Sequence, residues 1–396
     1  MMKLNKIIIF LFISTFTSAQ GTWIQKNNFA GSSRQGAFGF SISTSGYVCG
    51  GAFPMQLDLR EHNTILDSWT SKANFTGNGR YFARGFTIGT KAYVGTGWNG
   101  STNYNDFWEY DSGNNSWTQK TSLPAGARHE AVGFAIGNKG YIGTGYDGGA
   151  NYYNDLWEYD PAADTWTQKT SLPGGVREGA VAFSIGTKGY IGTGRGQSGF
   201  YNDLWEFDPV ANSWTQKTSF PGTARDDGFG FSIGNKGYIG TGQNSTTVYS
   251  DFFEYDPATN AWTACNNFPG GNRTYATGFS VGAKGYAGLG YNGSMNQNDY
   301  WEFSPPTSSI KENENRSGIT IFPNPSSGEI TLVSNSNSEI SALIIYDLFG
   351  REIKKTETIS ENEIKLDCKN FNAGIYFVHL FLKNGLTYRE KLLVEN

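Results

Sequence analysis

The sequence has few cysteines, few histidines and little net charge, and each shortage excludes a class of protein. Its three cysteines, Cys49, Cys265 and Cys368, stand at unrelated positions among 396 residues. Neither a disulfide framework nor a zinc knuckle is indicated, and we expect three separate thiols. Three histidines are too few for most imidazole-based metal sites, so we expect no metal and no cofactor. The net charge of -4 comes without a cluster of basic residues, which argues against nucleic acid as a partner.

Long apolar runs are also missing, except for one at the N-terminus. Two lysines precede the run from Ile7 to Phe16, and the small residues Thr-Ser-Ala follow it, which is the order of a secretory signal peptide. The run is about half as long as the roughly 20 apolar residues that cross a bilayer. We predict a signal peptide over residues 1–19, cleaved between Ala19 and Gln20, and no transmembrane segment.

Glycine, aromatic residues and a repeat dominate the rest of the chain. The 52 glycines and the 15% aromatic content are typical of a turn-rich β protein. Each repeat has a tryptophan, an arginine eleven residues later and a phenylalanine six residues after that. The tryptophans, 46 to 49 residues apart, are Trp23, Trp69, Trp117, Trp166, Trp214 and Trp262. The arginines are Arg34, Arg80, Arg128, Arg177, Arg225 and Arg273.

Each repeat contains signals for four short strands. Residues 131–136 alternate between small and large apolar side chains, as strands do, and glycine-containing turns such as Ile-Gly-Asn-Lys-Gly (136–140) predict hairpins. Four strands per unit without a helical period predict a six-bladed β-propeller over residues 20–304. The chain enters at the Trp23 strand and leaves the repeat after Phe303. We therefore expect the N-terminal strand to complete the last blade with residues 274–303, which covers open strand edges.

The repeat resembles the kelch repeat. The resemblance rests on a glycine-rich strand end, Gly50-Gly51 or Gly143-x-Gly145, followed by Tyr-Asp-Pro and a tryptophan, over residues 22 to about 304. Most units have Gly-Thr-Gly instead of Gly-Gly, and the first unit has Leu-Arg-Glu (59–61) in place of Trp-Glu-Tyr. Kelch propellers serve as binding platforms and occasionally as enzymes, so the resemblance implies the fold and leaves the function open.

The C-terminal part reads as a separate domain. A polar, proline-containing linker over residues 305–317 leads to alternating strand signals over residues 318–396, which predict a small Ig-like β-sandwich. Three motifs occur in order: IFPNPSSG (321–328), IIYDLFGR (344–351) and NAGIYFV (372–378). They resemble the type A C-terminal sorting domain of the Bacteroidetes type IX secretion system. The resemblance implies the type IX machinery as a partner and a secreted or outer-surface location; an ordinary Ig-like accessory domain is the alternative.

The six repeated arginines have two interpretations. They are ligand-binding candidates, because arginine suits the carboxylate of an acid or an acidic sugar. Their regularity favours structural pairing with an equally repeated aspartate or glutamate. The aspartates are Asp58, Asp106, Asp155, Asp203, Asp251 and Asp299, and the glutamates are Glu61, Glu109, Glu158, Glu206, Glu254 and Glu302.

Residues that break the repeat are the other site candidates. Both kinds of long connection should emerge on one face, where we expect the site. Directly after the second strand, Trp98, Tyr146, Arg195 and Tyr291 are ligand-binding candidates, with local loop packing as the alternative. The catalytic candidates that follow the arginines, with a solvated loop surface as the alternative, are His129, Glu130, Glu178, Asp226 and Asp227. The loops 147–155 and 292–299 lack the ligand spacing of a calcium loop.

The preferred function is therefore an exported binding or adhesion module whose long-loop face recognises a glycan or a protein. The alternative is a carbohydrate-active enzyme of the kelch-propeller sialic acid epimerase type, and a third hypothesis is a purely structural surface component. The mouth of the central channel should distinguish them. Convergent arginine and acid groups favour an enzyme, an aromatic shelf favours binding, and a plugged mouth favours a structural role.

Overall fold

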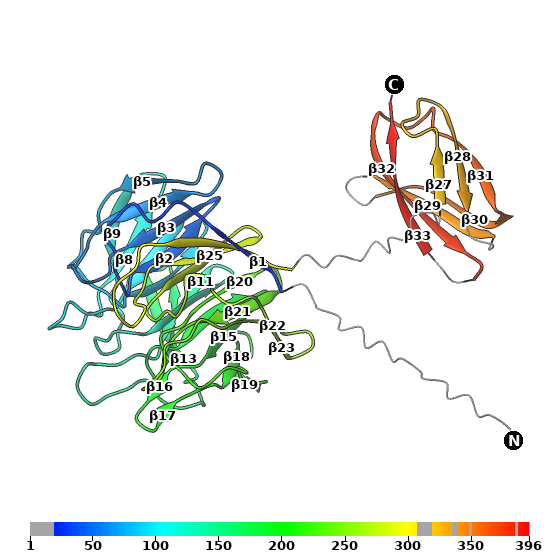
Figure 1. The fold of residues 1–396 in the computed structure, drawn as a ribbon. Coiled ribbons are helices and arrows are strands. Elements are labelled where there is room, and N and C mark those ends of the chain that lie inside the picture. Colours follow the sequence, from blue (N-terminus) through cyan, green and yellow to red (C-terminus); the bar gives the residue numbers. More distant parts are fainter. Residues whose placement is uncertain (1–19, 307–318, 335–338, 348–350, 385–386, 396) are drawn as a thin grey trace, which may run out of the picture. The chain divides into compact units, whose positions relative to one another are not determined.

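The computed structural model describes residues 20–306, 319–334, 339–347, 351–384 and 387–395, in two compact units, residues 1–307 and 308–396 (Figure 1). We describe each unit by itself. The expected signal peptide and residues 307–317 of the expected linker lie outside the described residues. Within the described part of the chain, no helix has the length and apolar character needed to cross a membrane.

The described residues of the first unit form six four-stranded antiparallel sheets. Five of them use strands in chain order, and in one of these a two-stranded hairpin, β16 (Arg195–Gly196) and β17 (Gly199–Phe200), lies between the second and third strands. Their strands are β2 (Phe38–Ile42), β3 (Ser45–Cys49), β4 (Leu59–Asn63) and β5 (Ser68–Lys72); β6 (Arg84–Ile88), β7 (Lys91–Gly95), β8 (Phe107–Asp111) and β9 (Ser116–Lys120); β10 (Val132–Ile136), β11 (Lys139–Gly143), β12 (Leu156–Asp160) and β13 (Thr165–Lys169); β14 (Val181–Ile185), β15 (Lys188–Gly192), β18 (Leu204–Asp208) and β19 (Ser213–Lys217); and β20 (Phe229–Ile233), β21 (Lys236–Gly240), β22 (Phe252–Asp256) and β23 (Ala261–Ala264). The inner strands contact one another in the order β2, β6, β10, β14, β20, β24 and back to β2, which closes a propeller.

The sixth blade joins the two ends of the repeat. Strands β24 (Thr277–Val281), β25 (Lys284–Gly288) and β26 (Tyr300–Ser304) are completed by β1 (Thr22–Gln25). Trp23 lies opposite Phe303 in the antiparallel register. The predicted closure by the N-terminal strand is confirmed.

Aromatic rings on the inner strands explain one repeated glycine. The ring of Phe86 in β6 occupies the place where a Cβ of Gly140 in the next blade would lie, and the ring of Phe134 fills the same place beside Gly189. Phe183, Phe231 and Phe279 fill the same place beside Gly237, Gly285 and Gly46, whereas Ala92 stands at this position in β7. Adjacent blades share these apolar contacts, so the ring is stabilised as a whole.

The second unit consists of two antiparallel sheets around one apolar core. The sheets are β27 (Ile319–Phe322), β28 (Glu329–Ser334) and β31 (Glu363–Asp367); and β30 (Glu352–Glu361), β29 (Ile340–Asp347), β32 (Gly374–Leu382) and β33 (Thr387–Val394). Leu332 from the first sheet and Ile345 and Val378 from the second are fully buried in this core. The arrangement agrees with the predicted β-sandwich. All three cysteines are buried and free, as expected.

Candidate functional site at the long-loop face

The six repeated arginines are buried and each is paired with the repeated aspartate of its own blade. Arg128 is typical: its Nη1 and Nη2 donate to the two carboxylate oxygens of Asp155 at 2.5 and 3.0 Å, and its Nη1 also donates to the Thr144 carbonyl at 2.9 Å. The other pairs are Arg34–Asp58, Arg80–Asp106, Arg177–Asp203, Arg225–Asp251 and Arg273–Asp299. The repeated glutamates instead accept hydrogen bonds from tyrosines, as Glu158 does from Tyr141 at 2.6 Å.

This geometry confirms the expected structural pairing and identifies aspartate as the partner. The arginines are at most 3% exposed. Their guanidinium groups tie the two kinds of long loop together in every blade. We therefore do not include them in the candidate site.

A closed ring of backbone hydrogen bonds joins the six blades, one or two residues before the channel-lining residues of each blade begin. It involves the second residue after each arginine, and each N–H donates to the carbonyl of the equivalent residue in the preceding blade at 2.8 to 3.2 Å. The ring members are Gly36, Phe82, Glu130, Gly179, Asp227 and Tyr275. All six have φ between 50° and 63°, a conformation that costs energy for residues other than glycine. The ring lies at one end of the channel and brings side chains of four different kinds together at this mouth.

Below the ring, the channel has a volume of about 480 Å³ and is lined by the inner strands. Arg84 is the single charged residue among those that line it. The other blades have phenylalanine, valine or threonine at this strand position, so Arg84 also breaks the repeat. Burial lowers the pKa of Arg84, and the negative charges of Asp227 and Glu130 oppose that shift. Arg84 was not among the sequence candidates, because the loop positions do not reveal it; the signal is an arginine where the inner strands of the other blades have an uncharged residue.

The structure brings the two sets of sequence candidates together. The residue after each arginine pairs through its backbone with the residue three positions after the second strand of the same blade: His129 with Tyr146, Glu178 with Arg195, Thr274 with Tyr291. The prediction that both kinds of long connection share one face is confirmed.

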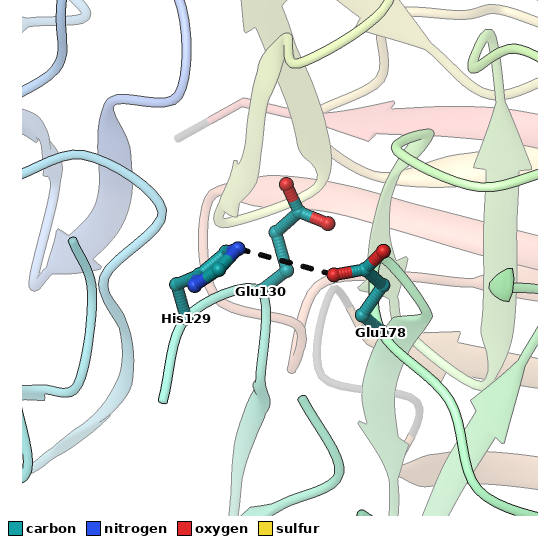
Figure 2. A group of neighbouring side chains, drawn as sticks. All are labelled: His129, Glu130 and Glu178. Carbon is teal, nitrogen blue, oxygen red and sulfur yellow. Dashed lines mark ion pairs between the residues drawn. The ribbon is translucent and has the colours of Figure 1, made fainter. Parts of the chain in front are cut away.

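The five catalytic candidates, which we name the acidic cluster, converge at one side of this mouth. His129, Glu130, Glu178, Asp226 and Asp227 are each at most 7% exposed. His129 Nε2 lies 3.9 Å from a Glu178 carboxylate oxygen, and Glu130 lies beside them (Figure 2). Arg195, on the short hairpin of β16 (Arg195–Gly196) and β17 (Gly199–Phe200), donates to Glu178 and lies 3.5 Å from Asp226. These groups form a connected polar cluster and not a solvated loop surface.

Burial raises the pKa values of three carboxyl groups in the acidic cluster and lowers the pKa of its imidazole. Burial raises the pKa of Glu130, and the charges of Glu178 and Asp226 raise it further. Burial raises the pKa of Asp226 to about 7 and also raises the pKa of Asp227. Burial lowers the pKa of His129 to about 4, which keeps the imidazole neutral. Groups with such shifts are typical of functional sites.

A cleft of about 530 Å³, which we name the neutral cleft, lies at another side of the same face. Its rings come from Phe53, Tyr275 and Tyr291. Its other lining residues are Gln35, Gln243, Ser294, Met295 and Asn296. None of the residues that line it is charged. Tyr275 also belongs to the backbone ring, and its hydroxyl accepts a hydrogen bond from Gln243 at 2.9 Å.

Two other candidates take part in local packing. Trp98 is half-buried and stacks on His129 with ring centres 5.4 Å apart. Tyr146 stacks on Tyr152 at 4.5 Å and donates to the Gly149 carbonyl at 2.7 Å. The Asp147 carboxylate accepts hydrogen bonds from the backbone of its own loop. Of the three aromatic candidates predicted from the sequence, Trp98, Tyr146 and Tyr291, it is Tyr291 that lines the neutral cleft.

Comparisons with known proteins assign the two units. Residues 320–395 match the family model of the secretion system C-terminal sorting domain. An endo-acting ulvan lyase from Formosa agariphila is 34% identical over 80 residues, which are 20% of this chain and 15% of the lyase. The solved structure of YjhT covers 69% of this chain and 95% of its own, with a TM-score of 0.61 and 17% identity, which shows a shared kelch propeller fold. The first unit thus has the propeller fold of YjhT, and the second is a type IX sorting domain, which indicates secretion or attachment to the outer cell surface.

Proposed function

We propose that this secreted kelch propeller binds an uncharged glycan segment in the neutral cleft. The supporting observation is the lining of the cleft: three aromatic rings and three side-chain amides without a charged group. Aromatic faces stack on the C–H faces of sugar rings, and amides both donate hydrogen bonds to hydroxyls and accept them. A volume of about 530 Å³ lies within the range of small-ligand sites.

The charges near the cleft favour a neutral ligand over an acidic one. The acidic cluster brings four carboxyl groups to the same mouth, and Arg195 is already bonded to one of them. The six repeated arginines are committed to aspartates. Because no residue that lines the cleft is charged, an anionic sugar would find no cation there to pair with.

Tyr291→Ala is expected to weaken glycan binding at least tenfold, because the substitution removes one ring of the neutral cleft. The matched control is Tyr146→Ala. Tyr146 occupies the same repeat position in another blade and lies outside the cleft, so its loss should change the affinity less than about twofold. A glycan array on the full-length chain, with neutral and acidic sets, identifies the ligand, and titration calorimetry measures both variants. The proposal is contradicted if the chain binds no neutral glycan, or if both variants lose affinity equally.

A second candidate function, a carbohydrate-active enzyme, is favoured by the position of Tyr275. Its ring lines the neutral cleft, and its backbone belongs to the same hydrogen-bonded ring as Glu130 and Asp227. A sugar in the cleft would therefore lie near the acidic cluster, where an imidazole and carboxyl groups converge.

Turnover tests this second function. We expect Glu178→Gln to reduce turnover at least a hundredfold and to leave Tyr291-dependent binding in place. Glu206→Gln, which changes a repeated glutamate bonded to Tyr190, is expected to leave turnover unaffected. Proton NMR on bound neutral sugars detects anomeric exchange or bond cleavage. The enzyme hypothesis fails if both variants turn over sugars like the parent chain, or if the parent chain has no turnover.

A further inference from the structure

Three groups of the acidic cluster are arranged like the ligands of one metal ion. His129 Nε2 and carboxylate oxygens of Glu130 and Glu178 all lie within 4.8 Å of one another (Figure 2). Ligand atoms bound to one ion at about 2.0 to 2.2 Å lie roughly 3 to 4 Å apart. Side-chain adjustments of about an ångström would bring all three atoms to an ion between them.

A hydrogen bond fixes the orientation of the imidazole. His129 Nδ1 lies 2.7 Å from Asn103 Oδ1. An amide oxygen only accepts hydrogen bonds, so Nδ1 carries the proton and the lone pair of Nε2 points to the side of Glu178. Metal-ligating histidines typically donate their other N–H in this way.

Unpartnered carboxylate oxygens provide an independent indication of a ligand. Asp226 and Asp227 are 1% and 3% exposed, and the Oδ1 atom of each has no hydrogen-bond partner. Asp227 Oδ1 lies against Gly179, the residue next to Glu178, where a Cβ would approach it to 2.8 Å. Buried polar atoms are rarely left without partners, because desolvation then goes uncompensated. Water molecules bound to a cation would supply donors to both oxygens.

The propeller itself does not require this cluster. The positions equivalent to His129, Glu178 and Asp226 are Gln35, Tyr81 and Thr274 in the other three blades, which form the same backbone bridges. The four carboxyl groups face two nearby cations, Arg84 and Arg195. A divalent cation would bring a further positive charge to a cluster in which four carboxyl groups face two cations.

We propose that His129, Glu130 and Glu178 bind one divalent first-row metal ion, Mn²⁺ or Zn²⁺, with Asp226 and Asp227 accepting hydrogen bonds from its water ligands. The mixture of one imidazole with carboxylates suits these ions, whereas Ca²⁺ prefers six to eight oxygen ligands. The low histidine count led us to expect no metal, but one correctly oriented histidine is sufficient when carboxylates supply the other ligands.

Titration calorimetry on the chelator-treated full-length chain tests the proposal with MnCl₂, ZnCl₂ and CaCl₂. We expect one equivalent of Mn²⁺ or Zn²⁺ to bind and Ca²⁺ to bind at least tenfold more weakly. Glu178→Gln should abolish binding, and Asn103→Ala should weaken it about 10- to 100-fold because the imidazole loses its orienting partner. Tyr291→Ala and Glu206→Gln should bind the metal like the parent chain, so failure of the glycan proposal leaves this proposal standing.

Stoichiometric binding that survives in Glu178→Gln overturns the proposal, as does the absence of binding by the parent chain. Anomalous scattering from crystals of the parent chain soaked in MnCl₂ gives an answer that does not depend on variant folding. A peak between His129 and Glu178 supports the site. A peak elsewhere, or no peak, refutes it.

Discussion

Replacing Arg128 by alanine is expected to lower the free energy of unfolding of the propeller by about 3 to 5 kcal/mol, because it leaves the largely buried Asp155 carboxylate without its cationic partner. The Arg128 side chain is fully buried, and it gives two hydrogen bonds to Asp155 and one each to the Thr144 and Gly126 carbonyls. Its guanidinium carbon also lies 3.8 Å from the centre of the Tyr153 ring. The substitution therefore removes packing, a cation–π contact and four hydrogen bonds together.

The matched control for Arg128→Ala is a surface ion pair in the same blade. Lys139 lies 2.6 Å from Asp160, and both side chains are about a third exposed. Lys139→Ala should cost less than about 1 kcal/mol. Urea unfolding followed by tryptophan fluorescence reports on the propeller alone, because all eleven tryptophans lie between Trp23 and Trp301. Equal shifts in the two variants would show that the buried pair is not a structural element.

The fold could be predicted from the sequence because every blade repeats the same physical requirements. The spacing of the tryptophans gave the number of blades, and the phase of the repeat gave the closure through Trp23. The partner of each arginine remained open, since aspartate and glutamate recur with equal regularity. The strand register decides between these partners. Glu158 lies opposite Tyr141 within the blade, whereas Asp155 ends the loop that precedes β12 and pairs with Arg128 from the neighbouring loop, which precedes β10.

The candidate site could be predicted only in part. Comparison between blades identified the acidic cluster, because a position that changes between equivalent blades is not dictated by the scaffold. Comparison between blades could not show that Glu130 and Asp227 belong to one backbone ring, since the hydrogen bonds of that ring join residues from different blades. The neutral cleft also combines residues far apart in sequence, Phe53 and Tyr291 among them. Trp98 was a weaker candidate than its sequence position suggested, because His129 and Tyr81 already stack on it.

Removing residues 20–26 is expected to open the propeller ring and lower its melting temperature by more than 10 °C. The deletion removes β1, which pairs with β26 over four residues, and with it the Trp23 ring. That ring lies 4.9 Å from Phe303 and 5.1 Å from Phe252, so it packs on its own blade and on the preceding one. Loss of a fully buried tryptophan costs about 3 to 5 kcal/mol, and the partly buried Trp23 goes together with a whole strand. About 1 kcal/mol shifts the melting temperature of a domain of 150–250 residues by roughly 2 to 4 °C. The exposed edge of β26 should also promote aggregation.

A relocated strand separates the effect of ring closure from the effect of chain length. In the deleted chain, residues 20–26 are inserted after Ser304 through a copy of the turn that joins β12 to β13 in an ordinary blade. The insert can then pair with β26 as a hairpin, in the way that β13 pairs with β12. We expect calorimetry to show recovery of most of the lost melting temperature. An insert of the same length with Trp23 and Ile24 replaced by serine should not restore it. If the deletion melts like the parent chain, the N-terminal strand does not hold the ring closed. If it melts lower and neither insert restores it, the position of the strand in the sequence matters beyond its pairing, because only an N-terminal strand ties the two ends of the propeller together.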